Sequence, residues 1–532
     1  MMRFRAILTY FCLLALPLAA GGQEAGECRD FRFAADTNPF LSLSNPAAVS
    51  AFDGHISMAG LDFRKDNGGL ISLTESADSY KAGAYTESYF CISERISFHG
   101  GLSWSYFSGK WMGAQVLMDP LFNPVNFLES DEANTGTRNR EDYSLLGAMS
   151  FKLNDKWALG CEIDYSSADQ TKVKDPRFSN VWMDMNLKAG ASFRPDQSTL
   201  LGAALIYRST MEQIRGGIYG TTDKQYFIMA DKGSFLGTVA GLSGDMDYVP
   251  MTEFRPMKND FFGLSLQALT GAWTNEAEVL YRMGYYGKKA SDSATYFEFS
   301  GIRAGYSCRF QTRSGADIYK ASLKLDYELL GNYENLFSYV QVTGQNTTIN
   351  YYGQNHISDR HLCSAALSFV WHKGVDGYLP ELSVGASVSG QGRFQTTVLY
   401  PFYRKSNCVG MAAEAFADRN IRKGASVFSL GGRLDFRYGL GNPKEDGVYD
   451  LPYGTISGTT LRSFDNYLFR QFEYDTAPAA GAGLSFAYTR IISGKAAACV
   501  KVSDSFSMLI NEPQYLSGRF RNVASVTLGL SF

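Results

Sequence analysis

Long apolar runs are almost absent from this chain. Beyond the first twenty residues, no segment reaches the 18 consecutive apolar residues that indicate a membrane-spanning helix. Acidic and basic residues nearly cancel, since 53 aspartates and glutamates against 50 lysines and arginines leave a net charge of −3. The first absence excludes a membrane protein built of helices, and the second gives no support to nucleic-acid binding.

Cysteine is sparse and gives no sign of a disulfide framework. The eight cysteines are single and far apart, without any Cys-x-x-Cys pair, whereas disulfide frameworks usually show clustered cysteines in even number. Most of them fall where apolar and polar residues alternate, so we expect them to act as small apolar side chains. No metal or other cofactor is predicted. The cysteines are at positions 12, 28, 91, 161, 308, 363, 408 and 499.

The first 22 residues have the pattern of a secretory signal peptide. Arg3 and Arg5 precede an apolar run from Ala6 to Ala20, and small residues follow. This run is short of the ~20 residues that a membrane anchor needs. No cysteine directly follows the small residues, so no lipoprotein site is indicated. We therefore predict a secreted chain that loses residues 1–22.

What the chain has in abundance is a strand pattern of period two. In residues 157–165, WALGCEIDY, every second side chain is apolar, and residues 319–329 and 428–438 repeat this pattern. Successive side chains of a strand point to opposite faces, so each segment has one apolar and one polar face. An ordinary soluble sandwich alternates too, but its strands usually run only ~5–6 residues. The length of these segments therefore favours a membrane barrel.

The connections between these strands alternate in length. Short turns on one side and long loops on the other are typical of outer-membrane barrels. The segments predicted as short turns are 93–95, 153–156, 195–198, 274–277, 313–316, 374–377, 419–424 and 493–495. The segments predicted as long loops are 109–141, 169–180, 211–258, 287–295, 331–357, 391–404, 438–479 and 507–520.

We therefore predict an all-β fold, a transmembrane antiparallel β-barrel in a Gram-negative outer membrane. The eight turns, with one strand before and one after them, give a best count of 18 strands within a range of 14–18, and both termini are expected to be periplasmic. Residues 68–92 fit one bent strand or two, and 336–350 and 391–400 fit loops or hairpin extensions above the membrane. As domains, we predict a periplasmic or lumenal segment over 23–53 and the barrel over 54–532.

The last predicted strand, NVASVTLGLSF, has apolar residues at every second position from Val526 to Phe532. A closed barrel has no free edge, so this strand must pair with the first. Phe532 is then expected at the membrane interface, where aromatic side chains are favoured. A terminal aromatic residue after such alternation resembles the C-terminal signal that the outer-membrane assembly machinery recognises. The predicted partners are outer-membrane lipid and that machinery, and no nucleic acid.

The charged residues of these strands are expected to face the lumen. A lysine or arginine exposed to lipid at the membrane midplane costs ~2–4 kcal/mol, so the apolar face must point outward. Cations and anions are about equal on the polar face, which favours an ion-paired interior or a pore without strong charge preference. The lumen-lining residues that we single out for binding are Arg303, Arg309, Lys320, Lys324, Asp326, Glu328, Arg433, Asp435 and Arg437.

Residues 36–48, DTNPFLSLSNPAA, precede the first strand and contain Asn45, Pro46 and Ala47. They resemble the Asn-Pro-Ala element near the N-terminus of the FadL-type family of long-chain fatty-acid transporters. The resemblance implies a segment that enters the lumen as a small hatch, past which hydrophobic ligands move. The residues alone also allow a plain turn, because Asn-Pro dipeptides mark turns. The barrel as a whole resembles uncharacterised outer-membrane proteins of Bacteroidota-type bacteria.

Two groups of histidines are candidates for a metal site or a catalytic pair. His356, Asp359 and His361 are all ligand-type residues, but their spacing matches no zinc pattern, and solvated loop residues are the favoured interpretation. His99 shares a strand face with Ser97, which is the type of pair that hydrolases use. No orienting acid is evident, so we predict no enzyme activity.

Aromatic residues mark two predicted loop tips, Tyr351–Tyr352 and Tyr400–Tyr403. Such residues suit either a binding surface or the outer aromatic girdle of a barrel. As function, we expect a passive channel or a FadL-like transporter of a small or hydrophobic solute. The alternative is a barrel without transport that anchors surface loops for binding a partner protein or ligand.

Overall fold

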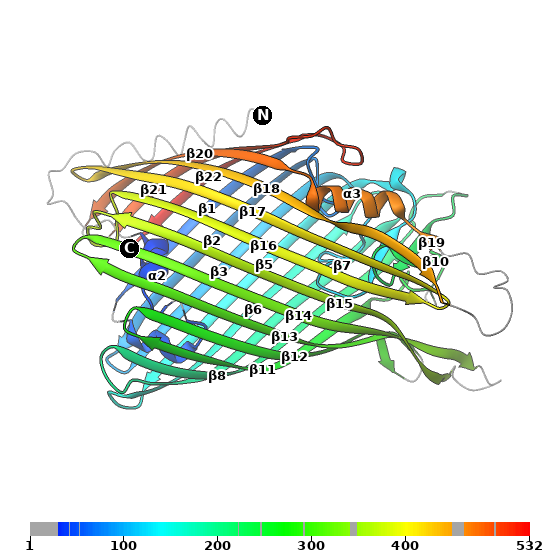
Figure 1. Cartoon of the computed structure of the whole chain (residues 1–532), viewed down its shortest axis with the longest axis horizontal. Coiled ribbons are helices and arrows are strands. Elements are labelled where there is room, and N and C mark those ends of the chain that lie inside the picture. The colour runs from blue at the N-terminus through cyan, green and yellow to red at the C-terminus, as the bar shows by residue number, and fades with distance from the viewer. Residues whose placement is uncertain are drawn as a thin grey trace.

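The computed structural model describes residues 30–41, 43–52, 54–221, 223–244, 247–290, 293–340, 348–449, 462–493 and 496–532. The predicted signal peptide, residues 1–22, lies outside the described residues. Figure 1 shows the strands side by side around one cylinder, with the chain running from blue at its start to red at its end. No helix in the described ranges is long and apolar enough to cross a membrane.

Eighteen antiparallel strands form one closed barrel, which confirms the predicted fold class and the best count. The first and last strands close it, since β1 pairs with β22 from Met58, opposite Ser531, to Gly68, opposite Arg521. The strands are β1 (Ile56–Gly68), β2 (Asp78–Ser93), β3 (Ile96–Met112), β5 (Gly136–Lys152), β6 (Trp157–Lys172), β7 (Arg177–Phe193), β8 (Thr199–Gly217), β11 (Arg255–Thr270), β12 (Trp273–Ala290), β13 (Ser293–Ser314), β14 (Asp317–Val340), β15 (Thr348–Lys373), β16 (Leu382–Leu399), β17 (Phe402–Lys423), β18 (Ser426–Val448), β20 (Ala479–Ser493), β21 (Ala496–Leu509) and β22 (Phe520–Ser531).

Short turns gather at one end of the barrel, here the short-turn end, and the longer connections at the other, the long-loop end. The turn predicted at 274–277 is wrong, because these residues continue β12 and the turn lies at 271–272. Gly271 has φ +57°, a conformation that glycine adopts without strain, and this residue rather than the later polar ones sets the turn. Residues 494 and 495 of another predicted turn lie outside the described residues.

Several segments predicted as long loops continue the strands instead. Within 331–357, β14 runs to Val340 and β15 begins at Thr348, and within 391–404 only residues 400–401 separate β16 from β17. Two neighbouring strands satisfy each other's backbone groups above the membrane as well as within it. Hairpin extension, the alternative for 336–350 and 391–400, is therefore confirmed. The same correction applies to 169–180 and 287–295, and within 68–92 the structure has the single strand β2 after residues 69–77.

The outer surface of the barrel is apolar. Leu205 on β8 and Leu434 on β18 are 67% and 65% exposed, and other large apolar side chains alternate with inward polar ones in the same way. An apolar band bordered by aromatic rings is the surface of an outer-membrane barrel, so the protein lies in the outer membrane. Outward-facing aromatic pairs beside the short turns are Trp157–Phe193, Trp273–Phe310, Tyr319–Trp371 and Phe428–Tyr488.

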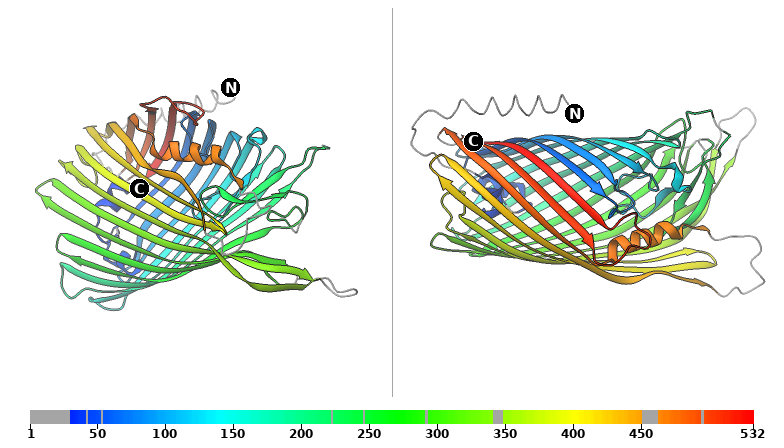
Figure 2. Two further views of the ribbon diagram at one scale, coloured as in Figure 1. Left: turned by 45° about the vertical axis from the view of Figure 1, so that its right-hand side comes forward. Right: turned by 90° about the horizontal axis from the view of Figure 1, so that it is seen from above.

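The long connections fill the long-loop end of the lumen. Their small strands β4 (Asn126–Glu129), β9 (Phe227–Asp231), β10 (Leu236–Gly241) and β19 (Arg462–Ser463) form a separate four-stranded sheet. The helix α3 (Asp465–Thr476) packs beside this sheet against β17 and β18, and Figure 2 shows it at the same end of the barrel. We call the described parts of 113–135 and 218–254 the loop plug. Its apolar side chains and inward residues of the barrel wall share the largest buried core.

The segment before the first strand lies at the opposite, short-turn end. It contains the helix α2 (Phe31–Thr37) and the 3-10 helix η2 (Pro46–Ala51). Figure 1 shows α2 within the barrel wall at that end. η2 contacts β3, β5, β6, β7 and β8, and its residues 46–50 are buried. This segment therefore lies inside the lumen and packs against the inner face of the barrel wall.

Candidate functional site in the barrel lumen

The nine predicted lumen-lining residues all occupy inward positions, opposite in strand parity to the exposed apolar side chains. On β14, Lys324, Asp326 and Glu328 alternate with the exposed Leu325, Tyr327 and Leu329. The structure separates the nine into three groups by their position in the lumen. Arg309 and Lys320 lie near the N-terminal segment, Arg303, Lys324, Asp326 and Glu328 lie midway along the lumen, and Arg433, Asp435 and Arg437 lie on β18. A role of these side chains in binding stays a proposal.

Most of the inward charges are paired. Arg282 reaches Glu328 at 2.6 Å, and Asp326 has looser contacts of 3.6 Å with both Arg303 and Lys324. Further pairs cross between neighbouring strands, among them Lys188–Glu162 at 2.9 Å, Arg208–Asp184 at 2.6 Å and Arg433–Glu414 at 2.8 Å. The wall thus has little net charge, in keeping with the balance expected from the sequence.

Two of the nine residues hold the N-terminal segment. Lys320 on β14 forms an ion pair with the carboxylate of Asp36, and Arg309 on β13 donates to the Asp36 carbonyl at 3.3 Å. Deeper in the segment, the Ser44 hydroxyl donates to Glu276 of β12. These contacts join the segment to one side of the wall.

Asn45 is the central anchor of this segment. It is 1% exposed, and its amide nitrogen donates to the carbonyls of Ala191 (3.0 Å) and Ala203 (3.2 Å) and to Gln267 Oε1 (3.0 Å). Its side-chain oxygen accepts from the backbone N–H of Ala47 at 2.9 Å, which caps η2. The Asn-Pro-Ala element is therefore a turn, as one interpretation held, and at the same time a contact with three barrel strands.

Three glycines make room for this contact. Gly160, Gly190 and Gly202 lie at inward positions of the consecutive strands β6, β7 and β8, and we call them the glycine cradle. A Cβ at Gly190 would lie 2.1 Å from Asn45 Oδ1, and a Cβ at Gly160 would lie 2.4 Å from the backbone of residues 46–47. Any larger residue at these positions would push the segment away from the wall.

Replacing Gly190 with leucine is expected to detach residues 45–51 from the wall. Overpacking of this kind typically costs about 1–3 kcal/mol, and here the segment is the part free to move. Hydrogen exchange followed by mass spectrometry should show lost protection in peptides that cover η2. The matched control is Gly432→Leu on β18, because no heavy atom lies within 4 Å of a Cβ built there. Unchanged protection in Gly190→Leu would show that the glycine cradle does not hold the segment.

At the long-loop end, two buried arginines fasten the loop plug. Arg360 on β15, 4% exposed, donates to the carbonyls of Leu121 (2.8 Å), Phe122 (3.1 Å) and Asn123 (2.9 Å). Arg282 on β12, 1% exposed, donates to the Phe122 carbonyl at 2.9 Å and lies over the Phe122 ring at 4.4 Å. Both guanidinium groups thus come from the barrel wall, and both donate to the Phe122 carbonyl of the plug.

One buried acid of the loop plug adds to this attachment, and a second holds the plug's own backbone. Glu129 of β4 is fully buried beside Lys172 of β6, at 2.5 Å, and burial raises the pKa of this carboxyl. Burial likewise raises the pKa of Asp231 in β9 to about 6, although backbone N–H groups of the next residues bond to its carboxylate. Glu129 therefore joins the plug to the wall, whereas Asp231 holds the backbone of its own loop.

Below the plug, the lumen contains a cavity of about 320 Å³, here the lower chamber. Two successive rungs of inward residues line it. Arg303, Glu328, Leu362 and Arg393 pair in register on one rung, and Asp326, Ser364 and Gln391 on the rung below. Leu121 of the plug and Asp475 of α3 close it from the long-loop side, with Arg393 at 3.2 Å from Asp475. The chamber contains Arg303, Asp326 and Glu328 of the predicted set.

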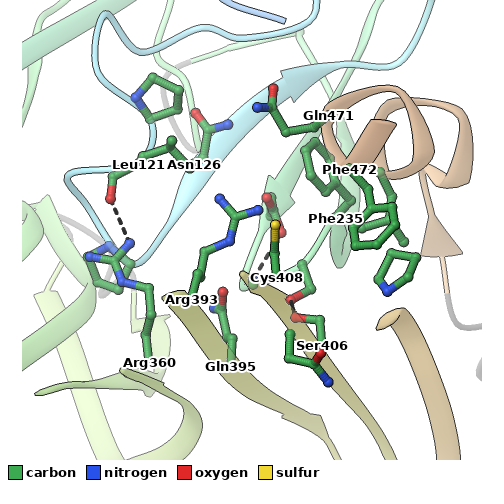
Figure 3. A pocket seen from close by; sticks show the side chains of 18 of the residues that line it. Leu121, Asn126, Phe235, Arg360, Arg393, Gln395, Ser406, Cys408, Gln471 and Phe472 are labelled. Atoms are coloured by element: carbon green, nitrogen blue, oxygen red, sulfur yellow. Dashed lines mark hydrogen bonds between the residues drawn. The ribbon is translucent and has the colours of Figure 1, made fainter. Parts of the chain in front are cut away.

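A smaller cavity of about 70 Å³, here the upper pocket, lies on the next rung toward the long-loop end. Figure 3 shows Arg393 pointing into it, with Arg360 nearby and bonded to Leu121. Arg393 and Cys408 belong to the walls of both cavities, so the arginine separates them. Arg360 Nε and Asn126 Oδ1, also in this wall, are buried without a hydrogen-bond partner in the described part of the chain.

Toward the short-turn end of the lumen, several inward side chains are exposed. Lys324 and Arg433 are 65% and 56% exposed, and Ser389, Ala412 and Lys501 are exposed as well. Within the N-terminal segment, η2 covers β3 and β5–β8, while α2 reaches Lys320 of β14 through Asp36 and His372 of β15 through Phe33. The lower chamber therefore lies between a solvent-exposed vestibule and the loop plug.

Arg360, Arg393 and Asp475 are functional candidates that sequence reasoning missed. Arg393 fell in the predicted loop 391–404, and Asp475 in the predicted loop 438–479. The alternation of polar inward residues Gln391, Arg393 and Gln395 with outward Phe394 continues the strand pattern, and this signal could have identified Arg393. For Asp475 the sequence had no comparable signal, because α3 is positioned by tertiary contacts.

The histidine groups do not form the sites considered for them. His361 bonds to Tyr327 on the outer face at 2.8 Å, while His356 bonds to Asp359 at 3.0 Å. His99 does have an orienting acid, contrary to expectation, since Glu87 of β2 lies 2.8 Å from its ring. The Ser97 hydroxyl, however, lies against Cys91 Sγ at 3.6 Å. Within the described part of the chain, His99 thus bonds to a carboxylate, and Ser97 to a thiol rather than to the imidazole.

Comparison with known proteins finds one sequence family and several barrels of similar fold. A profile described as "Family of unknown function (DUF6850)" matches residues 46–532, and no curated protein matches. A FadL homologue of Pseudomonas aeruginosa aligns over 93% of this chain and 94% of its own, with 12% identity and a TM-score of 0.30. The toluene transporter TbuX of Ralstonia pickettii aligns over 96% of both chains, with 10% identity and a TM-score of 0.30. The ferric preacinetobactin receptor BauA of Acinetobacter baumannii aligns over 90% of this chain and 80% of its own, with 7% identity and a TM-score of 0.39.

Proposed function

Because the chain belongs to the DUF6850 family of unknown function over residues 46–532, we propose its function from the lumen alone: a gated outer-membrane transporter of a small solute. The observation that carries this proposal is the lower chamber of about 320 Å³, which lies inside the barrel between the vestibule and the loop plug. A passive channel has no need of an internal chamber behind a fastened plug. The charged wall around the chamber favours a polar solute over a hydrophobic one.

In this proposal, the loop plug is the gate. Residues 121–123 leave their arginine partners, a solute passes into the chamber, and it continues through the vestibule toward the short-turn side. That side is assigned to the periplasm because outer-membrane barrels have their short turns there. The N-terminal segment narrows the vestibule along β5–β8 and is the counterpart of the hatch implied by the FadL resemblance.

Uptake by proteoliposomes tests this function. Vesicles that contain the full barrel are expected to take up radiolabelled N-acetylglycinamide, a small neutral solute, faster than protein-free vesicles. The rate should rise further when the plug is loosened. Uptake equal to that of protein-free vesicles, both for the native barrel and for a barrel with a loosened plug, would refute transport.

The alternative, a barrel that anchors a binding surface, is favoured by its extended hairpins. The β14–β15 hairpin carries Tyr352, 70% exposed, and the β16–β17 turn carries Tyr400, 66% exposed. Exposed aromatic residues are enriched at protein interfaces. A photo-crosslinker placed at Tyr352 in intact cells that captures one surface protein, together with absent uptake, would favour this function.

The other proposed partners concern the membrane and assembly. Outer-membrane lipid contacts the apolar outer face, and we propose that the assembly machinery recognises the strand that ends at Phe532. Two backbone hydrogen bonds, of 2.8 and 3.0 Å, join Phe532 to Ser57, so the terminal residue is part of the barrel seam. Its side chain is 54% exposed and free to be recognised before closure.

A further inference from the structure

The two cavities differ in charge, and this difference points to a class of solute. We propose that the lower chamber and the upper pocket together bind a small zwitterion with the build of an amino acid or a short peptide, its carboxylate at Arg393 and its ammonium group at Asp326. The inference rests on the proposed transport function, whose solute it names.

The upper pocket has unused capacity for an anion. Arg360 makes its three bonds to neutral carbonyls, and its Nε is buried without a partner in the described part of the chain. Arg393 enters the same pocket from the neighbouring strand and has one carboxylate contact, Asp475, at 3.2 Å. A carboxylate between these two guanidinium groups would receive charge-assisted hydrogen bonds. Asp231 is the acid in the wall of this pocket, and its carboxylate already accepts from the Gly233 N–H at 2.9 Å.

The lower chamber, in contrast, suits a cationic group. Asp326, Glu328 and Asp475 line it together with two arginines, Arg303 and Arg393. Glu328 is held by Arg282 at 2.6 Å, whereas the contacts of Asp326 with Arg303 and Lys324 are both 3.6 Å, beyond hydrogen-bond distance. Asp326 accepts one long hydrogen bond, from the Ser364 hydroxyl at 3.5 Å, and its remaining lone pairs can accept from an ammonium group. Since Arg393 lies between the two cavities, a solute that spans them meets a basic end and an acidic end.

The register of the wall fixes the orientation of such a solute. Asp326 lies one rung below Glu328 and opposite Ser364, while Arg393 lies opposite Leu362 on the rung above Ser364. The apolar side chains of Leu121 and Leu362 lie in the same wall and suit the carbon skeleton of a solute. A solute with one charge would satisfy only one end and would still displace water from the other. The geometry thus favours solutes with both charges over solutes with one.

Four dipeptide-like probes separate these contributions. Calorimetry of the full barrel in detergent compares glycylglycine with N-acetylglycine, which lacks the ammonium group, glycylglycinamide, which lacks the carboxylate, and N-acetylglycinamide, which lacks both. We expect glycylglycine to bind at least about tenfold more tightly than either singly charged probe, as two charge-assisted contacts predict. Equal binding of glycylglycine and either singly charged probe would overturn the proposal, and so would equal binding of the neutral probe.

Two variants assign the ends of the solute. Arg393→Gln should remove the advantage of glycylglycine over glycylglycinamide, and Asp326→Asn its advantage over N-acetylglycine. Each variant should keep the preference that depends on the other end of the solute, which a merely structural defect would abolish as well. Lys501→Gln, an exposed inward cation on β21 far from the chamber, is the matched control and should bind all four probes as the native barrel does. If both variants keep the full preference for glycylglycine, the assignment is wrong.

Binding and uptake report on different proposals. Preference for glycylglycine in calorimetry without uptake of any probe would refute transport and leave the zwitterion site standing. Uptake of N-acetylglycinamide without any preference for glycylglycine in calorimetry would leave transport standing and refute the zwitterion site.

Discussion

The double variant Arg282→Met/Arg360→Met is expected to convert the closed barrel into one that conducts ions steadily in a planar lipid bilayer. The two guanidinium groups supply all of the described hydrogen bonds between the wall and the carbonyls of residues 121–123. Methionine keeps much of the volume of the arginine stem and removes the donors. The plug then has buried carbonyls without partners in its closed position.

The size of the increase in the open fraction follows from the buried polar groups that lose their hydrogen-bond partners. Each buried acceptor without a donor costs about 1–3 kcal/mol, and loss of Arg282 also leaves Glu328 without its 2.6 Å partner. The open arrangement, in which water reaches these groups, carries no such cost. A shift of roughly 3 kcal/mol in favour of opening raises the open fraction by about a hundredfold. Each single variant should have a smaller effect, because the remaining arginine still binds Phe122.

Chymotrypsin provides a second measurement on the same protein. Phe122 and Phe127 lie in the plug, and Phe127 is fully buried in the native structure, so cleavage at these residues requires the plug to open. We expect rapid cleavage of 113–135 in the double variant and slow cleavage in the native barrel and in Lys501→Met. Rapid cleavage without a rise in conductance would show that the plug is not the barrier. Slow cleavage together with native conductance would show that the two arginines do not hold it.

The barrel could be predicted from the sequence because its causes are local. Apolar and polar residues alternate in stretches such as 319–329 because one face of each strand meets lipid and the other meets the lumen. The strands are long because they must span the membrane. The same alternation assigns Arg303, Asp326 and Glu328 to the inward face from the sequence alone. The prediction was wrong at 391–404, because the tyrosine- and proline-containing turn occupies only residues 400–401 and the strand that carries Arg393 continues up to it.

The plug could not be predicted in this way. Its packing depends on contacts between segments far apart in the chain, such as Leu121 with Arg360, or Glu129 with Lys172. No periodicity marks these segments, because they follow neither strand nor helix for more than a few residues. The glycine cradle was also invisible, since a glycine in a strand has several explanations until the neighbouring chain is placed. The wall of the site could therefore be predicted from the sequence, whereas the segments that close the site could not.

Exchanging Leu205 for arginine is expected to destabilise the barrel by about 2–4 kcal/mol, the cost of a cation facing lipid near the midplane. Leu205 is six positions beyond Thr199, the first residue of β8, and tilted strands rise roughly 15 Å over that distance, about half of an apolar band some 25 Å tall. Its side chain is 67% exposed and pairs across the sheet with Leu264, itself exposed. No acid on these neighbouring positions could compensate the charge.

The matched substitution Ser389→Arg places the same side chain on the opposite face. Ser389 is exposed toward the vestibule and lies opposite Ala366 and Ala412 in the register, so an arginine there has room and water. Its cost should stay within about 0.5 kcal/mol, as for a surface substitution. Urea titration of both variants refolded in phospholipid vesicles gives the two free energies of unfolding. Equal costs would mean that the two faces meet the same solvent, and the division into a lipid face and a lumen face would then be wrong, along with every function that depends on the lumen.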